Sequence, residues 1–197
     1  MSEQAWAAFS ERVGWDFRFH ATCEPSARPR PAELALVNDR NASVLVAVSA
    51  LMDKRSESTE DDSPLTQEVA RLDAKLNVLM EIVNRLLLPQ SGLPPRISVR
   101  FNAAGAVVTG ENLPPAGEPV LLKLHFDACR ALPLELPGTC LAVPDGWGEP
   151  VAGQRFVAFE GLSEGVRDGI ERLVFRQHRR QIAESRSHGR PHDAAGE

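Results

Sequence analysis

Residues 153–181 read GQRFVAFEGLSEGVRDGIERLVFRQHRRQ, which joins a strand pattern to a helix pattern. Arg155 to Phe159 form a short run that predicts a β-strand. Ser163 has the side chain of a helix N-cap, and arginines in the last turns suit the negative end of a helix. The stretch therefore predicts a strand followed by a long amphipathic helix. Its apolar positions are Val166, Ile170, Leu173, Val174 and Phe175.

Upstream of this stretch, the period of the apolar residues is two rather than helical. Glycine and proline turns, such as 114–117 and 145–146, separate several short strand candidates. Short strands at this spacing are typical of a small antiparallel barrel. The candidates are 96–101, 103–109, 120–126, 131–136, 139–143 and 155–159.

The first half of the chain is predicted to be mostly helical. A short helix over 5–13 precedes residues 15–20, which alternate apolar and polar side chains like a half-buried strand. After a proline-punctuated turn region, residues 33–51 have an apolar stripe at helical spacing, with polar Asn41 inside it. Residues 53–63 are polar and strongly acidic, so they are predicted to be a solvated linker.

A leucine heptad begins just after Pro64, which is well placed at the first position of a helix with Ser63 as N-cap. The helix is predicted to run to about Leu88, where Pro89 stops it. Such a seam of apolar residues needs a partner helix. Position a holds Val69, Leu76 and Val83, and position d holds Leu65, Leu72, Leu79 and Leu86.

The flanking positions of the heptad determine which assembly it favours. Position e contains Met80 and Leu87 and position g contains Ile82, so the seam is broad in its C-terminal half. A parallel dimer would also place Glu68 opposite Asp73 of its partner, which is a like-charge contact. We therefore predict a homo-oligomer, a tetramer ahead of a dimer, with parallel and antiparallel arrangements both open. The alternative is that the helix over 33–51 and the barrel cover the seam within one chain. The predicted interface comprises Leu65, Val69, Leu72, Leu76, Leu79, Met80, Val83 and Leu86.

Composition excludes several classes of function. The net charge of −5 provides no general field for nucleic acid, and 43% hydrophobic residues is ordinary globular composition. The longest nearly apolar run, 44–52, is too short to span a bilayer, so no membrane insertion is predicted. Three cysteines without C-x-x-C spacing argue against a disulfide framework and a zinc site, and they suit the cytoplasm. No nucleophile or metal motif is present, so we predict no enzymatic activity, no metal and no cofactor.

The strands from Val99 onward, the run 153–162 and the closing helix ending at Gln181 resemble a PilZ domain over roughly half of the chain. Residues 72–79 and 86–88 resemble the atypical, helix-extended branch of that bacterial family. The resemblance implies an α+β fold, in which a six-stranded antiparallel barrel carries a closing helix and a coiled-coil-like helical insertion. The strand near Phe17 is a possible member of the barrel. The resemblance also implies self-association through the inserted helices and a role in cyclic di-GMP signalling.

The ligand motifs of that family are degenerate in this chain. A ligand-binding PilZ domain carries an R-x-x-x-R pair before the barrel and a D/N-x-S-x-x-G motif on an early strand, where guanidiniums clamp phosphates and stack on guanine. If Gly105 is the motif glycine, Arg100 and Asn102 stand where the acid or amide and the serine belong. Arg96 and Arg100 have the R-x-x-x-R spacing, but they lie on the strand itself.

Two functions remain open from the sequence. The first is a non-enzymatic adaptor that self-associates and binds an unidentified partner protein, with cyclic di-GMP binding lost or weakened. The second is an atypical cyclic di-GMP receptor that uses Arg96, Arg100 and Asn102, or a basic stripe on the last helix at Arg172, Arg176 and Arg180. The predicted organisation is an N-terminal segment over 1–30, a helical oligomerisation module over 31–90, the barrel with its closing helix over 91–186, and a disordered tail over 187–197.

Overall fold

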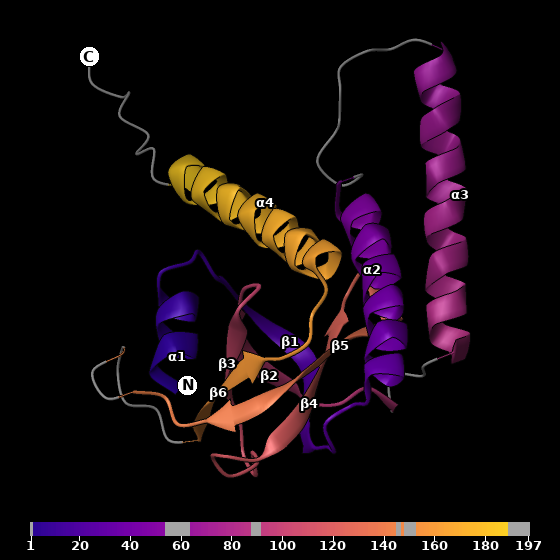
Figure 1. Ribbon diagram of the computed structural model, residues 1–197. Helices are drawn as coiled ribbons and strands as arrows, with labels where there is room; N and C mark the ends of the chain where they lie inside the picture. The colour runs from indigo at the N-terminus through magenta and orange to yellow at the C-terminus, as the bar shows by residue number, and fades with distance from the viewer. Residues whose placement is uncertain (1, 54–63, 88–91, 145–146, 148–152, 189–197) are drawn as a thin grey trace, which may run out of the picture.

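The computed structural model describes residues 2–53, 64–87, 92–144, 147 and 153–188 (Figure 1). The predicted linker over 53–63 lies outside the described residues apart from Asp53, and so does the predicted tail except for its first two residues, which end the last helix. The elements in chain order are α1 (Ser2–Ser10), β1 (Trp15–Pro25), α2 (Pro31–Asp53), α3 (Pro64–Leu87), β2 (Arg96–Phe101), β3 (Gly105–Thr109), β4 (Pro119–Phe126), β5 (Cys129–Leu141), β6 (Gln154–Phe159) and α4 (Glu164–His188).

The strands form a closed six-stranded barrel in the order β1-β2-β3-β6-β5-β4, with every neighbouring pair antiparallel. The N-terminal half of β1 pairs with β2 and its C-terminal half pairs with β4. His20 lies at the crossover, opposite both Arg96 and His125. The predicted barrel is confirmed, and the strand near Phe17 closes it.

Strand β5 is continuous, although the sequence predicts two strands separated at Pro137 and Gly138. Gly138 stays in the strand because β6 passes very close to it. A Cβ at this position would lie 2.3 Å from the carbonyl oxygen of Ala158, which is far inside van der Waals contact. The glycine therefore serves a close approach of two strands rather than a turn.

Helix α4 lies across one end of the barrel and α2 packs beside it (Figure 1). Ser163 caps α4 as predicted, because its Oγ accepts a hydrogen bond from the backbone nitrogen of Val166 at 3.3 Å. Both helices bury an apolar stripe against the inward-facing side chains of the strands, which makes a single main core. The stripe residues are Val44, Leu45 and Val48 of α2 and Val166, Ile170, Leu173 and Val174 of α4.

Two asparagines hold α2 against the barrel. Asn41 is fully buried; its Nδ2 donates to the carbonyl oxygen of Glu135 at 2.6 Å, and its Oδ1 accepts from the Glu135 nitrogen at 2.9 Å. Asn38 makes the same double contact, to the Gly161 carbonyl at 3.0 Å and the Ser163 nitrogen at 2.9 Å. By length and composition alone, Pro31–Met52 is sufficient to cross a bilayer. These contacts fix that helix to the barrel.

Helix α3 contacts β5 and otherwise stands away from the barrel (Figure 1). The side chains of Leu65 and Met80 fall outside the described residues. The other predicted interface positions are 42% to 77% exposed, so neither the barrel nor α2 covers them within one chain. They are Val69, Leu72, Leu76, Leu79, Val83 and Leu86.

Candidate functional site

The outer face of β2 carries Arg96, Ser98 and Arg100, but its two arginines turn in different directions. Arg96 donates from Nη2 to Oδ1 of Asp127 at 2.5 Å and from Nη1 to the carbonyl oxygen of Arg18 at 2.8 Å. Arg100 donates from Nη1 to Oδ2 of Asp16 at 3.2 Å. The R-x-x-x-R spacing therefore does not bring two guanidiniums together.

Arg100 lines a groove of about 330 Å³ on the outside of β1, β2 and β3. We call it the β2 groove. The carbon of the Arg100 guanidinium lies 5.7 Å from the ring centroid of Trp147, within the range of a cation–π contact. Such a groove offers positive charge, hydroxyl donors and an indole face, which are the groups that bind phosphates and bases. Its polar lining comprises Asp16, Arg18, Ser98, Arg100, Thr109 and Gln154, and Arg96 is not part of it.

Arg18 and Trp147 are groove residues that the sequence analysis missed. Arg18 lies on β1 between the exposed Phe17 and the buried Phe19. Only the register of the barrel places Arg18 beside β2. Trp147 comes from the connection between β5 and β6 and makes edge contact with Trp6 of α1, at 5.1 Å between ring centroids. The one sequence signal that could have identified Trp147 is the presence of an aromatic residue within a segment rich in glycine and proline.

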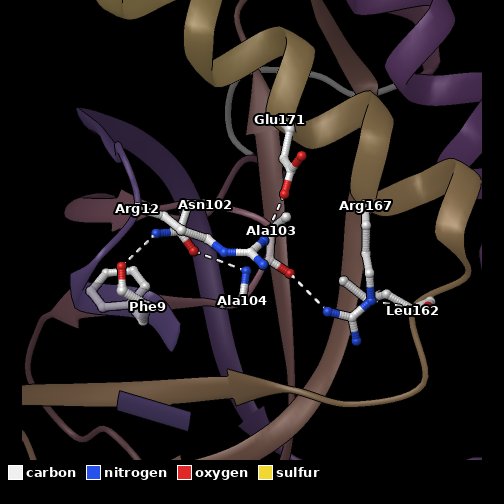
Figure 2. A network of polar contacts seen from close by, with 8 residues as sticks. All are labelled: Phe9, Arg12, Asn102, Ala103, Ala104, Leu162, Arg167 and Glu171. Atoms are coloured by element: carbon white, nitrogen blue, oxygen red, sulfur yellow. Dashed lines mark hydrogen bonds and ion pairs between the residues drawn. The ribbon is translucent and has the colours of Figure 1, made fainter. Parts of the chain in front are cut away.

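Asn102 is buried where β2 turns into β3 and is engaged within the protein (Figure 2). Its Nδ2 donates to the carbonyl oxygen of Phe9 at 2.9 Å, and its Oδ1 accepts from the backbone nitrogen of Ala104 at 2.9 Å. The amide therefore joins the end of α1 to the turn of the barrel. It does not line the β2 groove, and its role as a ligand residue stays a prediction.

Gly105 has a packing reason of its own. A Cβ at this residue would lie 2.5 Å from Cε2 of Phe156 and 2.6 Å from the carbonyl oxygen of Val157. No side chain fits there while β3 pairs with β6. Gly105, the last residue of the R-x-N-x-x-G spacing, is therefore required for barrel packing, so its presence is not evidence of a ligand-binding role.

The Asn102→Ala variant is expected to lose about 2 kcal/mol of unfolding free energy, because the buried carbonyl of Phe9 and the partly buried N–H of Ala104 lose their partner. Urea denaturation measures this loss, with Ser98→Ala, an exposed position on the preceding strand β2, as the control. The control should change stability by less than about 0.5 kcal/mol. Equal stability of the two variants would contradict the structural role of Asn102.

The arginine stripe predicted on α4 also fails to converge on one surface. Arg176 donates from Nη2 to Oγ of Ser49 on α2 at 2.8 Å. Arg172 lines a groove beside Phe175, whereas Arg180 lines a separate cavity with Trp15. The three side chains therefore do not act as one anion clamp in this structure.

The three cysteines are free and are held as neutral thiols. Burial raises the pKa of Cys23 to about 12, with smaller contributions from Cys140 and Glu24. Burial also raises the pKa values of Cys129 and Cys140. Among the described residues there is no group of three or more histidines, cysteines or acids that could hold a metal ion.

The comparisons with known proteins agree with this geometry. A family model described as "Atypical PilZ domain, cyclic di-GMP receptor" matches residues 45–187. No curated protein matches the chain. One solved structure, a pathogenic protein from Xanthomonas campestris, is described as a tetrameric PilZ domain self-assembled via an unusual helical bundle. It is 27% identical with a TM-score of 0.67, and the match covers 92% of this chain and 97% of that chain. The barrel, the inserted helices and the family match together show that this chain belongs to the atypical PilZ domain family.

Proposed function

We propose that this protein is a non-enzymatic signalling adaptor that self-associates through α3 and binds a partner protein, with little or no affinity for cyclic di-GMP. The observation that carries the proposal is the uncovered heptad face of α3. We also propose a cytoplasmic location, because three free cysteines held as thiols suit a reducing compartment.

The exposed seam supports self-association on energetic grounds. Its a and d side chains are about half exposed in the single chain, and completing the burial of each contributes on the order of 1 kcal/mol. The described positions repeat over more than two heptads, so the contributions accumulate along the helix. A partner helix with the same pattern is available in every other copy of the chain.

A tetramer is the preferred assembly. Ile82 at position g is about half exposed as well, so the apolar surface is wider than the a and d positions of a two-stranded coil. The Xanthomonas campestris relative, which is described as a tetramer formed by a helical bundle, supports the same arrangement for this chain. A four-helix bundle covers a broad seam more completely than a dimer does.

The state of the arginines supports weak ligand affinity. Arg96 and Arg100 are each paired with a carboxylate, Asp127 and Asp16, and binding a dinucleotide through them would require these contacts to be exchanged. The Asn102 amide is buried and already bonded on both sides. The remaining groups of the β2 groove do not reproduce an arginine pair on a flexible segment.

Isothermal titration calorimetry of cyclic di-GMP into the wild-type chain is therefore expected to show a Kd weaker than about 100 µM. Light scattering on the same sample should give the mass of four chains. A micromolar Kd that is lost in Arg100→Ala or Arg96→Ala, and kept in Arg30→Ala as the control, would overturn the weak-affinity part of the proposal. A mass of one chain would overturn the self-association.

The second candidate function is a cyclic di-GMP receptor with an atypical binding pose. The observation that favours it is the combination of Arg18, Arg100 and Trp147 at the β2 groove, where a base could stack on the indole and phosphates could meet the guanidiniums. A micromolar Kd for cyclic di-GMP in the same calorimetric titration would identify this function. Trp147→Ala would then weaken binding together with Arg100→Ala.

A further inference from the structure

A second groove lies at the β2–β3 turn, between the segment that links α1 to β1 and helix α4. We call it the Phe175 groove. It has a volume of about 460 Å³, the largest of the grooves described above, and no part of the β2 groove contributes to it. Its lining comprises Arg12, Val13, Asn102, Glu171, Arg172, Val174 and Phe175.

Two lining residues of the Phe175 groove, Arg12 and Glu171, contact each other across it (Figure 2). Arg12 donates from Nη1 to Oε1 of Glu171 at 2.6 Å, which links the segment after α1 to α4. On the same helix, Arg167 donates to the carbonyl oxygens of Leu162 at 3.2 Å and Ala103 at 3.4 Å. The groove is therefore already formed, and binding there would cost little reorganisation.

Large apolar side chains face solvent along this groove. Phe175 is 56% exposed and Val13 is 47% exposed, although the neighbouring residue Val174 is buried in the core. Ile182 follows Phe175 by seven positions on α4 and is also exposed, so the apolar surface continues along one face of the helix. Exposed aromatic residues beside a preformed groove are typical anchors of protein interfaces.

The rim of the groove is positively charged. Arg172 lines the groove, and no acidic residue follows it on α4 before Glu184, although the whole chain has a net charge of −5. The guanidinium carbon of Arg179 lies 6.0 Å from the ring centroid of Phe175, so charge and apolar surface coincide. Arg12 is neutralised by Glu171, which leaves Arg172 and Arg179 as the exposed cations beside Phe175.

From these observations we infer that the Phe175 groove docks a short acidic amphipathic segment of a partner protein. Apolar side chains of the segment pack on Phe175 and Val13, and its carboxylates meet Arg172 and Arg179. The inference deepens the proposed adaptor function and rests on it. A lipid surface or a nucleic acid would use the charge without needing the apolar groove, so we favour a protein segment.

The test uses the full-length chain and a phage-displayed library of random peptides roughly 12 residues long. Peptides enriched on the wild type are expected to combine a large apolar residue with net negative charge. Fluorescence anisotropy of an enriched peptide should then show a Kd at least about tenfold weaker for Phe175→Ser and for the Arg172→Glu, Arg179→Glu variant. Leu132→Ser is the matched control, because Leu132 is equally exposed on β5 and does not line the groove.

Each other outcome counts against the inference. No enrichment, enrichment without an acidic bias, or equal affinity of wild type and Phe175→Ser would overturn it. Binding of phosphatidylglycerol vesicles or of single-stranded DNA, lost in the arginine variant but kept in Phe175→Ser, would assign the basic rim to a lipid or a nucleic acid instead. Light scattering on every variant distinguishes loss of peptide binding from loss of self-association. If a tetramer forms but binds no peptide, the docking inference is wrong while the proposed self-association stands.

Discussion

The Leu76→Glu, Leu79→Glu variant is expected to scatter light as a single chain, whereas the wild type is expected to scatter as the proposed tetramer. Both leucines are about half exposed in the isolated chain and belong to adjacent a and d positions. In a bundle, the substitutions would bring several carboxylates into one apolar seam. Burying an unpaired carboxylate costs several kcal/mol, so two per chain raise the dissociation constant by at least about 10³-fold.

The matched control for this prediction is Ala74→Glu, Val78→Glu. These residues lie at positions f and c of the same helix, and both are exposed. The control adds the same charge to α3 without entering the seam, so it should keep the mass of the wild type. Identical masses for the seam variant and the wild type would show that α3 does not assemble the protein. A control that also dissociates would show that helix charge rather than seam burial is responsible.

The Asn41→Ala variant is expected to lose about 3 kcal/mol of unfolding free energy. Asn41 satisfies both the N–H and the carbonyl of Glu135 on β5; the asparagine is fully buried and Glu135 is partly buried at the α2 interface. Alanine leaves two backbone groups unpaired and opens a small cavity. Guanidinium denaturation should be carried out in the Leu76→Glu, Leu79→Glu background, because unfolding of an oligomer depends on protein concentration.

Asn38→Ala provides the comparison for Asn41→Ala. It removes the same pair of side-chain bonds from the same helix, but the site is more open to water, which can replace them. We expect a loss of about 1 kcal/mol. If the two variants lose equal free energy, burial is not what makes Asn41 important. If neither destabilises the protein, α2 is not held to the barrel by these contacts.

The barrel was predictable from the sequence because its strands carry a period-two pattern bounded by glycine and proline. Two features of the fold, one in the barrel and one in α2, were not predictable in this way. Gly138 looks like a strand break in the sequence, yet it is a crossing point whose reason lies on β6. Asn41 interrupts an apolar stripe in the sequence, yet its side chain bonds α2 to β5. The roles of Gly138 and Asn41 each depend on a backbone group that is distant in the sequence. A local sequence pattern cannot identify such a group.

The candidate sites were predicted less well than the fold. The spacing of Arg96 and Arg100 correctly placed both on one face of β2, but side-chain direction depends on Asp127 and Asp16, which other elements supply. Arg18 lines the β2 groove because of the register between β1 and β2. Trp147 lines it because the connection between β5 and β6 brings this residue back to the barrel surface. The α3 helix is a different case, because a heptad depends only on local residue spacing, and the assembly through it stays a prediction.

The position of β1 in the chain affects how the protein can be synthesised. This strand pairs with both β2 and β4, yet α2 and α3 are synthesised after β1 and before either partner strand. The nascent chain must therefore keep an unpaired edge while the helices emerge, and closing so long a loop slows barrel formation. If α3 helices of several chains associate first, each unpaired β1 meets the β2 and β4 of its neighbours at high local concentration. The order of the two events then determines whether barrels close within chains or exchange strands between them.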